Sequence, residues 1–434
     1  MTTISSSLLF FIVLLCDAQL SAQQTETTAT VQAPTKLTIS AAIDEAMANN
    51  LGLFAERANL TIAEAALLTA QLKPNPVLSL SAEHLDPSYK VFYNEAAGGP
   101  PEFSLRIDVP IELGNKRQLR VETVGFEKEI AAARLLDSAR KLRLDAALAC
   151  IDLIEAKAKF ALAADNFRTF EEVVRLNQTK VNAGFMPQQE LTRSQVAMLQ
   201  FRSTVKRAEL DWITAKTRLQ NILGRLSPTD DFDLPDNLKV PLYSGGLELA
   251  GLQEAAFIDR PDVQAQQRTQ ARSRAELKLQ LAQAIVDYTV GVEYRHVGTN
   301  SNSSNFAGFF FSMPLPLFSR NQGEVARVRA EQEQLTRQAR ALRAQVYSEV
   351  KTAYQEFAAM RELAEGIERD LLQPAQRARD NSAYVYKAGG STLVEFLDAQ
   401  RAFNDTMQSY YEAQGAYRRA VLKLNNAVGR EVIP

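Results

Sequence analysis

Residues 306–323 read FAGFFFSMPLPLFSRNQG. Four phenylalanines fall within the first six positions, Pro314 and Pro316 follow, and a polar turn precedes a long run rich in charge. Proline cannot continue a strand ladder or a helix interior, because it lacks an N–H donor and its φ is fixed. The stretch therefore predicts a corner where an aromatic strand ends and a long helix begins. An equivalent corner is expected at Pro110, in VPIELGN.

Four short stretches alternate between apolar and polar residues, as strands with two different faces do. In the clearest of them, Phe103, Leu105 and Ile107 alternate with Ser104 and Arg106. Each stretch has about the length of a tilted strand that crosses a bilayer. Two half-buried hairpins on a soluble core are the less specific interpretation. The expected strands cover about 77–84, 103–111, 289–297 and 306–313.

Stretches without glycine or proline predict unusually long helices. Residues 126–183 contain neither type, which corresponds to a helix of roughly 87 Å at 1.5 Å per residue. A matching stretch covers 324–365, with a kink expected at Pro374. Residues 41–72 are also expected to be helical, and the prolines of KPNP end that helix. Apolar residues recur at every seventh position of the first stretch, as in coiled coils: Leu153, Phe160, Phe167, Val174 and Val181.

The chain repeats itself once. AGFMPQQELTRSQ begins at Ala183 and AGGSTLVEFLDAQ begins at Ala388, and the same offset separates ILG at 222–224 from AVG at 427–429. Each repeat is expected to contain a helix, two strands, a very long helix, a tight turn and a second long helix. The expected division is a first repeat at 37–224, a linker at 225–246, a second repeat at 247–429 and a C-terminal end at 430–434.

The N-terminal residues are typical of an exported protein. Residues 8–15 are all apolar, too few to cross a bilayer, and small residues follow, so we expect 1–22 to be a signal peptide. A lipid anchor on Cys16 is an alternative, although Leu15 stands where a small residue is needed. Residues 23–36 are rich in Thr and Gln and are expected to be flexible. No later run approaches the length of an apolar membrane helix.

The composition argues against several classes of protein. The formal net charge is only -2, with 49 basic and 51 acidic residues, whereas a nucleic-acid binder needs a basic excess or stripe. No nucleophile elbow, zinc-protease, Walker or paired-cysteine motif occurs. The two histidines of the chain are too few to favour a histidine-based active site. We expect His84 and His296 to be interfacial side chains. We therefore expect no enzymatic activity, no cofactor and no metal site.

The strands and helices fit together in one physically reasonable way. The long helices are expected to pack on one another, which leaves the strands without a covering layer. Four strands cannot close a barrel, and sheet edges are not tolerated in lipid. Several copies of the chain must then pool their strands, with long helical arms extending away from the barrel. Phe309 and Phe311 would lie at the membrane interface.

Together these features resemble the TolC-like outer-membrane efflux channel family. The resemblance covers roughly residues 37–429 and is carried by the duplication, PNP before the first strand, VPIELGNKRQLRV, MPLPLFSRNQGEV, and the paired turns at Gly184 and Gly389. It implies a mainly α protein with a small membrane β part, located in the bacterial outer membrane. The implied assembly is a homotrimer whose twelve strands form one barrel, continued through the periplasm by an α-helical barrel.

The resemblance also implies the partners and the role of the chain. A tripartite efflux system would join this passive duct to a periplasmic membrane-fusion adaptor and to an inner-membrane pump of the resistance-nodulation-division type, and its sheet would contact outer-membrane lipid. VPIELGNKRQLRV and MPLPLFSRNQGEV are most similar to the branch that serves cobalt–zinc–cadmium pumps. Heavy-metal cations are therefore a candidate cargo.

Functional residues follow by the same resemblance. Two acids near the periplasmic end form rings around the channel axis in this family, and the matching positions are Glu395 and Asp398. Three copies of each would favour cations, because like carboxylates gathered near one axis attract positive charge. An ordinary solvated acidic face is the alternative. The positions expected at the tips, where the adaptor docks, are Gly184, Gly389, Glu190 and Arg193.

Two other classes of protein remain open at this point. A periplasmic coiled-coil adaptor or scaffold of an export system would also have long helical hairpins, but it would have one hairpin flanked by β domains. A secreted enzyme is disfavoured, because long seams and short strand pairs leave little room for a pocket.

Overall fold

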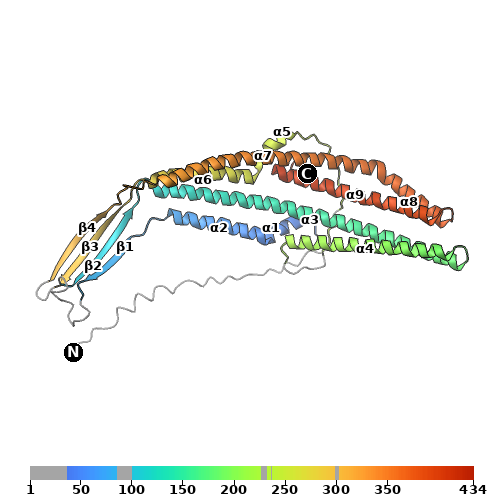
Figure 1. Cartoon of the computed structure of the whole chain (residues 1–434), viewed down its shortest axis with the longest axis horizontal. Coiled ribbons are helices and arrows are strands. Elements are labelled where there is room, and N and C mark those ends of the chain that lie inside the picture. Colours follow the sequence, from blue (N-terminus) through green and yellow to red (C-terminus); the bar gives the residue numbers. More distant parts are fainter. Residues whose placement is uncertain (1–36, 86–99, 226–231, 236, 299–302) are drawn as a thin grey trace, which may run out of the picture.

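The computed structural model describes residues 37–85, 100–225, 232–235, 237–298 and 303–434. Figure 1 shows an elongated molecule, with a small sheet at one end, two helical tips at the other and long helices between them. The expected signal peptide at 1–22, Cys16 and the segment at 23–36 lie outside the described residues.

The two halves of the chain contain the same order of elements. The first half contains α1 (Ile39–Asn49), α2 (Leu51–Gln71), β1 (Val77–Glu83), β2 (Glu102–Ile111), α3 (Lys116–Asn182) and α4 (Gln188–Ile222). The second half contains α5 (Leu249–Asp259), α6 (Pro261–Gln283), β3 (Tyr288–Gly298), β4 (Ser303–Ser312), α7 (Gln322–Gly366), the π-helix η2 (Ile367–Leu371), α8 (Leu372–Lys387) and α9 (Leu393–Val428).

The four strands form one antiparallel sheet in the order β1-β2-β3-β4. Its register places Leu105 opposite both Leu80 on β1 and Tyr294 on β3. Because side chains alternate between the faces of a strand, this register gathers the apolar residues on one face. β4 begins at Ser303, before the expected start at Phe306. β1 and β4 are the two edges of the sheet.

The first long helix is longer than the sequence predicted. α3 begins at Lys116, not near Phe126, and its 67 residues extend over roughly 100 Å. Gly125 lies inside the helix, where an added Cβ would meet nothing within 4 Å. A single glycine costs a helix only about 1 kcal/mol, and the packing of so long an element offsets that cost.

The expected single helix over 41–72 is wrong, because Asn50 divides it. Asn50 adopts an extended conformation, and its Oδ1 accepts a hydrogen bond from the Leu53 N–H at 3.1 Å. Asparagine is a preferred N-cap residue, because its side chain satisfies a backbone donor that the helix leaves free. The chain therefore ends α1 and starts α2 within one residue.

The expected kink at Pro374 lies slightly earlier than the proline itself. The five-residue π-helix Ile367–Leu371 separates α7 from α8, and Pro374 is the third residue of α8. Proline cannot donate to the preceding turn and its ring crowds that turn, so the helix widens just before it.

The buried stripe of α3 contains polar as well as apolar residues. The expected heptad series at Phe160, Phe167 and Val174 is only half-buried. α3 packs against helices on several sides (Figure 1), so the most buried positions lie beside that series. The fully buried positions toward the tip are Ala163, Asn166, Phe170, Val173 and Asn177.

Candidate functional site: an uncovered sheet and two helical tips

The sheet presents a continuous apolar face that no described residue covers. Leu80, Leu105 and Tyr294 are neighbours across β1, β2 and β3 on this face. Leu80 is 71% exposed, and Phe309 on β4 is 89% exposed. An exposed apolar patch of this kind marks a surface that contacts lipid or protein. Among the residues described, no helix combines the length and the apolar character that a membrane span requires.

The opposite face of the sheet carries charged residues in pairs. Arg106 contacts Asp108 at 2.9 Å on β2. Arg295 on β3 contacts Glu293 at 2.8 Å and Glu102 on β2 at 3.2 Å. Paired charges that remain partly exposed are compatible with water and not with hydrocarbon. The two faces of the sheet therefore suit two different media.

The three prolines expected at the corners occupy different places. Pro110 is the penultimate residue of β2, opposite Thr289 of β3, so it lies within the strand expected at 103–111 and directly before the connection to α3. The sheet tolerates it, because the β1 ladder begins at Val77 opposite Asp108 and no β1 residue faces Pro110. Pro314 and Pro316 lie between the end of β4 and the start of α7, as the expected corner requires.

Sequence reasoning missed two asparagines at the true starts of the long helices. Asn115 (φ 56°) precedes α3 and Asn321 (φ 60°) precedes α7, both in the left-handed conformation. Asparagine adopts this conformation more readily than other residues that have a side chain. Asn321 Nδ2 also donates to the Gln280 carbonyl at 2.8 Å. The sequence did contain a signal for these helix starts, because the two asparagines are separated by nearly the same offset as the two repeats.

Gly184 and Gly389 lie in the turns at the two tips. Their φ angles are +79° and +82°, and nothing lies within 4 Å of an added Cβ at either position. The Phe185 N–H donates to Lys180 O at 2.8 Å, and the Gly390 N–H donates to Val385 O at 2.9 Å. These bonds belong to Schellman motifs, which need a left-handed residue after the helix. Backbone conformation, and not lack of space, requires glycine here.

The expected gate acids lie at the start of α9 and are both exposed. The Thr392 N–H donates to Glu395 Oε2 at 3.0 Å, and the Glu395 N–H donates to Thr392 Oγ1 at 3.3 Å. This reciprocal pair is a capping box, so Glu395 also has a local structural role. Asp398 lies 3.8 Å from Arg401, and an exposed contact of this length holds the carboxylate weakly.

Glu190 and Arg193 pair with each other in the first turn of α4. Their side chains meet at 2.8 Å at a spacing of three residues. Arg193 therefore contacts its own helix and not a residue across the tip. The aromatic ring of Phe185, next to this pair, is 85% exposed. The tip thus offers a small charged and aromatic surface.

Buried hydrogen bonds join the two helical hairpins near the tips. Tyr386 Oη donates to Asn177 Oδ1 at 2.8 Å, and Gln400 Nε2 donates to Asn166 Oδ1 at 2.9 Å. These bonds connect α3 with α8 and α9. Burial raises the pKa of the Tyr386 hydroxyl, so it remains protonated and able to donate. Contacts between the hairpins are therefore directional as well as apolar.

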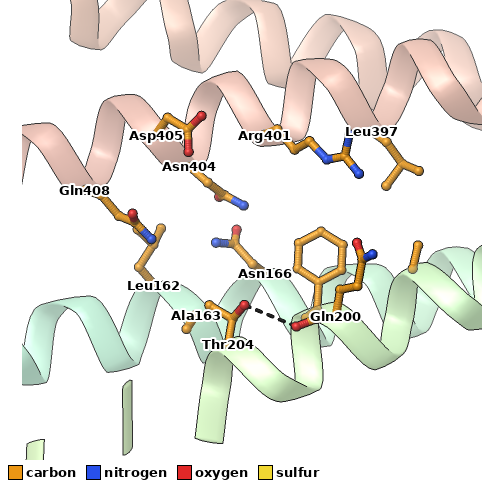
Figure 2. Close-up of a pocket in the computed structure, with 12 residues that line it drawn as sticks. Leu162, Ala163, Asn166, Gln200, Thr204, Leu397, Arg401, Asn404, Asp405 and Gln408 are labelled. Carbon is orange, nitrogen blue, oxygen red and sulfur yellow. Dashed lines mark hydrogen bonds between the residues drawn. The ribbon is translucent and has the colours of Figure 1, made fainter. Parts of the chain in front are cut away.

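A polar cavity of about 200 Å³ lies beside the second of these bonds, between α3 and α4 on one side and α9 on the other. Figure 2 shows its side chains facing one another across the gap between the hairpins. Polar cavities of this size admit water. Its polar lining includes Asn166, Thr204, Arg401, Asn404 and Gln408.

The two histidines lie at the sheet end of the molecule. His84 follows β1 with φ 57°, and its Nδ1 lies 4.0 Å from Glu102 Oε1. His296 on β3 contacts Asn305 Oδ1 through Nδ1 at 2.8 Å. Across the described part of the chain, no three His, Cys, Asp or Glu side chains are grouped as metal ligands.

Comparison with known proteins places this geometry in a family. The sequence model of the outer membrane efflux protein family matches residues 42–225 and 252–430. The chain is 22% identical to the cobalt-zinc-cadmium resistance protein CzcC of Cupriavidus metallidurans, over 91% of this chain and 90% of that protein. It is 24% identical to the pyoverdine export outer membrane protein OpmQ of Pseudomonas putida, over 69% and 66% of the two chains.

Solved structures share the fold. A CusC structure superposes with a TM-score of 0.74 at 17% identity and covers 93% of this chain and 96% of its own. The open state of the MtrE outer membrane channel of Neisseria gonorrhoeae gives 0.73 at 15% identity, over 91% and 89%. VceC of Vibrio cholerae gives 0.68 at 16% identity, over 91% and 97%.

Long helices that end in a sheet with one exposed apolar face fit an outer-membrane transport protein. This chain belongs to the outer membrane efflux protein family. It is the outer-membrane component of a tripartite efflux system, with its sheet in the outer membrane and its helices in the periplasm. The family match decides against the adaptor and scaffold alternative.

Proposed function

We propose that three copies of this chain pool their strands into a twelve-stranded barrel and continue it into the periplasm as a helical tunnel. The observation that carries the proposal is the incomplete sheet. One face is apolar and exposed, the other is charged, and β1 and β4 have free edges. Unpaired strand edges are too costly in lipid, so β1 of one copy must pair with β4 of the next.

The partners follow from the two ends of the molecule. The helical tips at Gly184 and Gly389 would contact a periplasmic membrane-fusion adaptor, and an inner-membrane pump of the resistance-nodulation-division type would supply the energy. The exposed Phe185 and the Glu190–Arg193 pair support the docking role of the first tip. The chain itself would act as a passive duct without a catalytic step.

Glu395 and Asp398 would form the periplasmic gate. Both carboxylates are exposed on one face of α9, one turn apart, so a three-fold axis beside that face would gather six of them. Such rings attract cations and repel anions. Asp398 would contribute more freely than Glu395, because Glu395 is also held by the capping box.

Divalent heavy-metal cations are the cargo we propose. The similarity to CzcC along nine-tenths of both chains supports this choice, and an acidic gate suits cations. OpmQ is by its name a pyoverdine export protein, so the cargo is tested directly. Metal-sensitive cells that lack their own channel should regain zinc, cobalt and cadmium resistance with this chain only if its pump and adaptor are present.

Disulfide trapping tests the assembly directly. β1 and β4 are separated by β2 and β3 within one chain, about 14 Å at the usual strand spacing, and a disulfide needs Cα atoms within about 7 Å. In a Cys150→Ala background, Ser79→Cys on β1 would be combined with single cysteines along β4. Dimers and trimers on non-reducing gels are expected at matching registers.

Two controls complete that experiment. Each single-cysteine variant should give no trimer, because a ring of three needs both edges. The Ser79→Cys variant combined with a cysteine at the far tip, Gln178→Cys, should also fail to cross-link into trimers. Monomers alone at every β4 position, in protein recovered from the outer membrane, would sink the barrel proposal.

A further inference from the structure

The connection between β4 and α7 is exposed along its whole length. Residues 313–320 are all exposed, although four of them are large and apolar. Leu315 and Leu317 are each 70% exposed and Phe318 is 91% exposed, with Met313 also exposed. No described residue of the chain covers this connection. It extends the apolar face of the sheet toward the helices.

The other three strand–helix connections lie at the same level of the molecule. Lys116 Nζ, at the start of α3, donates to Ile285 O at 2.6 Å and contacts Asp287 at 2.8 Å, between α6 and β3. Each connection also exposes an apolar side chain. These are Leu72 before β1, Leu113 after β2 and Ile285 before β3.

Unpaired cations accompany these apolar side chains. The two acids at this level already have partners, since Glu112 pairs with Arg120 at 2.9 Å and Asp287 pairs with Lys116. Among the residues that the structure describes, no carboxylate pairs with any of three nearby cations. Those cations are Lys73, Arg117 and Arg320.

A hollow lies between two of the connections. Its volume is about 390 Å³, and Leu315, Ile285 and Arg320 are among the residues that line it. Within the described part of the chain, the Arg320 guanidinium donates one long hydrogen bond, 3.4 Å from Nε to Pro316 O. A cation and apolar side chains therefore share one open surface.

We propose that this boundary, made by the four strand–helix connections, binds the phospholipid surface of the outer membrane that faces the periplasm. Leu315, Leu317 and Phe318 would enter the headgroup and acyl boundary, and the three cations would contact lipid phosphates. Apolar side chains bordered by Lys and Arg are the general signature of an interfacial anchor. Anionic phospholipids are the preferred occupants, because the boundary carries an excess of positive charge.

A second copy of the chain is the competing occupant. Burying the connections in a protein interface would desolvate Lys73, Arg117 and Arg320, none of which pairs with a described carboxylate of its own chain, and desolvating such cations is costly. A lipid surface supplies phosphates and leaves the cations in water. The proposal rests on the proposed insertion of the sheet in the outer membrane. Its test must therefore distinguish a failure of lipid binding at the boundary from a failure of sheet insertion.

Tryptophan fluorescence with brominated lipids provides that separation. Trp212 is the sole tryptophan and stacks on Phe160 at 5.4 Å, so Trp212→Phe gives a background that keeps the ring contact. In that background, three single variants would be placed in phospholipid vesicles: Phe309→Trp in the sheet, Phe318→Trp in the β4–α7 connection and Phe185→Trp at the tip. Bromines at different acyl depths report the depth of each indole.

The three variants have distinct expected results. Phe309→Trp should be quenched by deeper bromines than Phe318→Trp, because it lies farther into the sheet, and Phe185→Trp should be quenched by none. Quenching of Phe309→Trp without any quenching of Phe318→Trp would overturn this inference and leave the proposed barrel intact. Absence of quenching at both positions would overturn the barrel as well.

Lipid charge gives the second readout. With Phe318→Trp as the reporter, brominated phosphatidylglycerol should occupy the sites beside the indole about fivefold more effectively than brominated phosphatidylcholine. That factor corresponds to the attraction of about 1 kcal/mol between one Lys or Arg and an anionic lipid surface. Adding Lys73→Gln, Arg117→Gln and Arg320→Gln should bring the ratio close to one. Arg337→Gln, on the exposed surface of α7, is the matched control and should leave the ratio unchanged. A ratio that the triple variant does not alter would refute the role of the cations.

Discussion

Asn50 and Arg260 make the same contact in the two halves of the chain. Asn50 lies between α1 and α2, and its Nδ2 donates to Ile222 O at the end of α4, at 3.0 Å. Arg260 lies between α5 and α6, and its Nη1 donates to Ala427 O near the end of α9, at 3.3 Å. The last carbonyls of a helix have no partner within it. In both halves, the break in the short helix pair supplies one.

Removing Arg260 should destabilise the protein much more than removing Asn50. The Arg260 side chain is 4% exposed and contacts Asp262 and Glu349, each at 2.7 Å. Arg260→Ala leaves these acids without their partner and is expected to cost about 3–5 kcal/mol. Asn50→Ala removes a helix cap and is expected to cost about 1–2 kcal/mol. Urea unfolding in detergent, followed by circular dichroism, measures both values.

Arg337→Ala is the control for this comparison. Its pair with Glu333 is exposed on both sides at a spacing of four residues, so its loss should change the unfolding free energy little. Equal losses of unfolding free energy in Arg260→Ala and Arg337→Ala would show that the buried contact stabilises the protein no more than an exposed ion pair does.

Acid should weaken the contact around Arg260. Burial alone would raise the pKa of the Asp262 carboxyl, but the hydrogen bond and charge of Arg260 outweigh burial and hold that pKa below its ordinary value. A carboxyl with a lowered folded pKa stabilises the protein above its unfolded pKa, about 3.9, and this contribution is lost as pH falls through the folded value. Asp262→Asn should therefore flatten the fall in unfolding free energy below about pH 4. Asp380→Asn, at an exposed pair, should leave the slope unchanged.

Two glycines with the same left-handed backbone should respond differently to alanine. An added Cβ at Gly224 (φ +73°) would lie 2.3 Å from Asn49 O, whereas at Gly184 (φ +79°) it would meet nothing within 4 Å. Gly184→Ala should cost about 1–2 kcal/mol for conformation alone, and Gly224→Ala should cost clearly more. Thermal unfolding of the two variants tests this prediction. A larger loss of stability for Gly184→Ala than for Gly224→Ala would contradict the close approach of Asn49 to Gly224.

Neutralising the gate acids should increase conductance without unfolding the tip. Glu395→Gln preserves the capping box, since glutamine also fits its third position, so the variant isolates the charge. Combined with Asp398→Asn, it should raise single-channel conductance in planar bilayers and weaken the preference for cations. Glu333→Gln, on the exposed surface of α7, is the control for the loss of an exposed acid away from the gate. Wild-type conductance and selectivity in the double variant would remove the gate assignment.

Tyr386→Phe should loosen the contact between the hairpins. It removes the donor to Asn177 Oδ1 and leaves a buried amide whose Nδ2 already has no partner among the described residues. The expected loss is about 1–3 kcal/mol, and trypsin should cleave near the tip faster. Tyr384→Phe, two residues away and exposed, should be cleaved at the wild-type rate.

Regular patterns could be predicted well because they depend on local chemistry. Alternation at Phe103, Leu105 and Ile107 indicated a two-faced strand, and the apolar face is indeed uncovered. The corner at Pro314 and Pro316 could be predicted because proline cannot donate to a strand ladder or continue a helix interior. Helix ends were harder, because a left-handed asparagine such as Asn115 leaves no periodic trace.

Contacts between distant segments could not be read from the chain. The tie between Tyr386 and Asn177 joins residues 209 positions apart, and neither residue stands out locally. The same holds for Arg260, whose partners lie on α6, α7 and α9. Such polar contacts depend on which helix faces become buried.

By itself, the sequence determined that the chain is duplicated, largely helical and equipped with four two-faced strands, because these properties are periodic and local. Only the tertiary structure decided where the long helices begin and which polar side chains join the hairpins. Those outcomes depend on packing between elements far apart in sequence, and burial selects partners that no local pattern specifies.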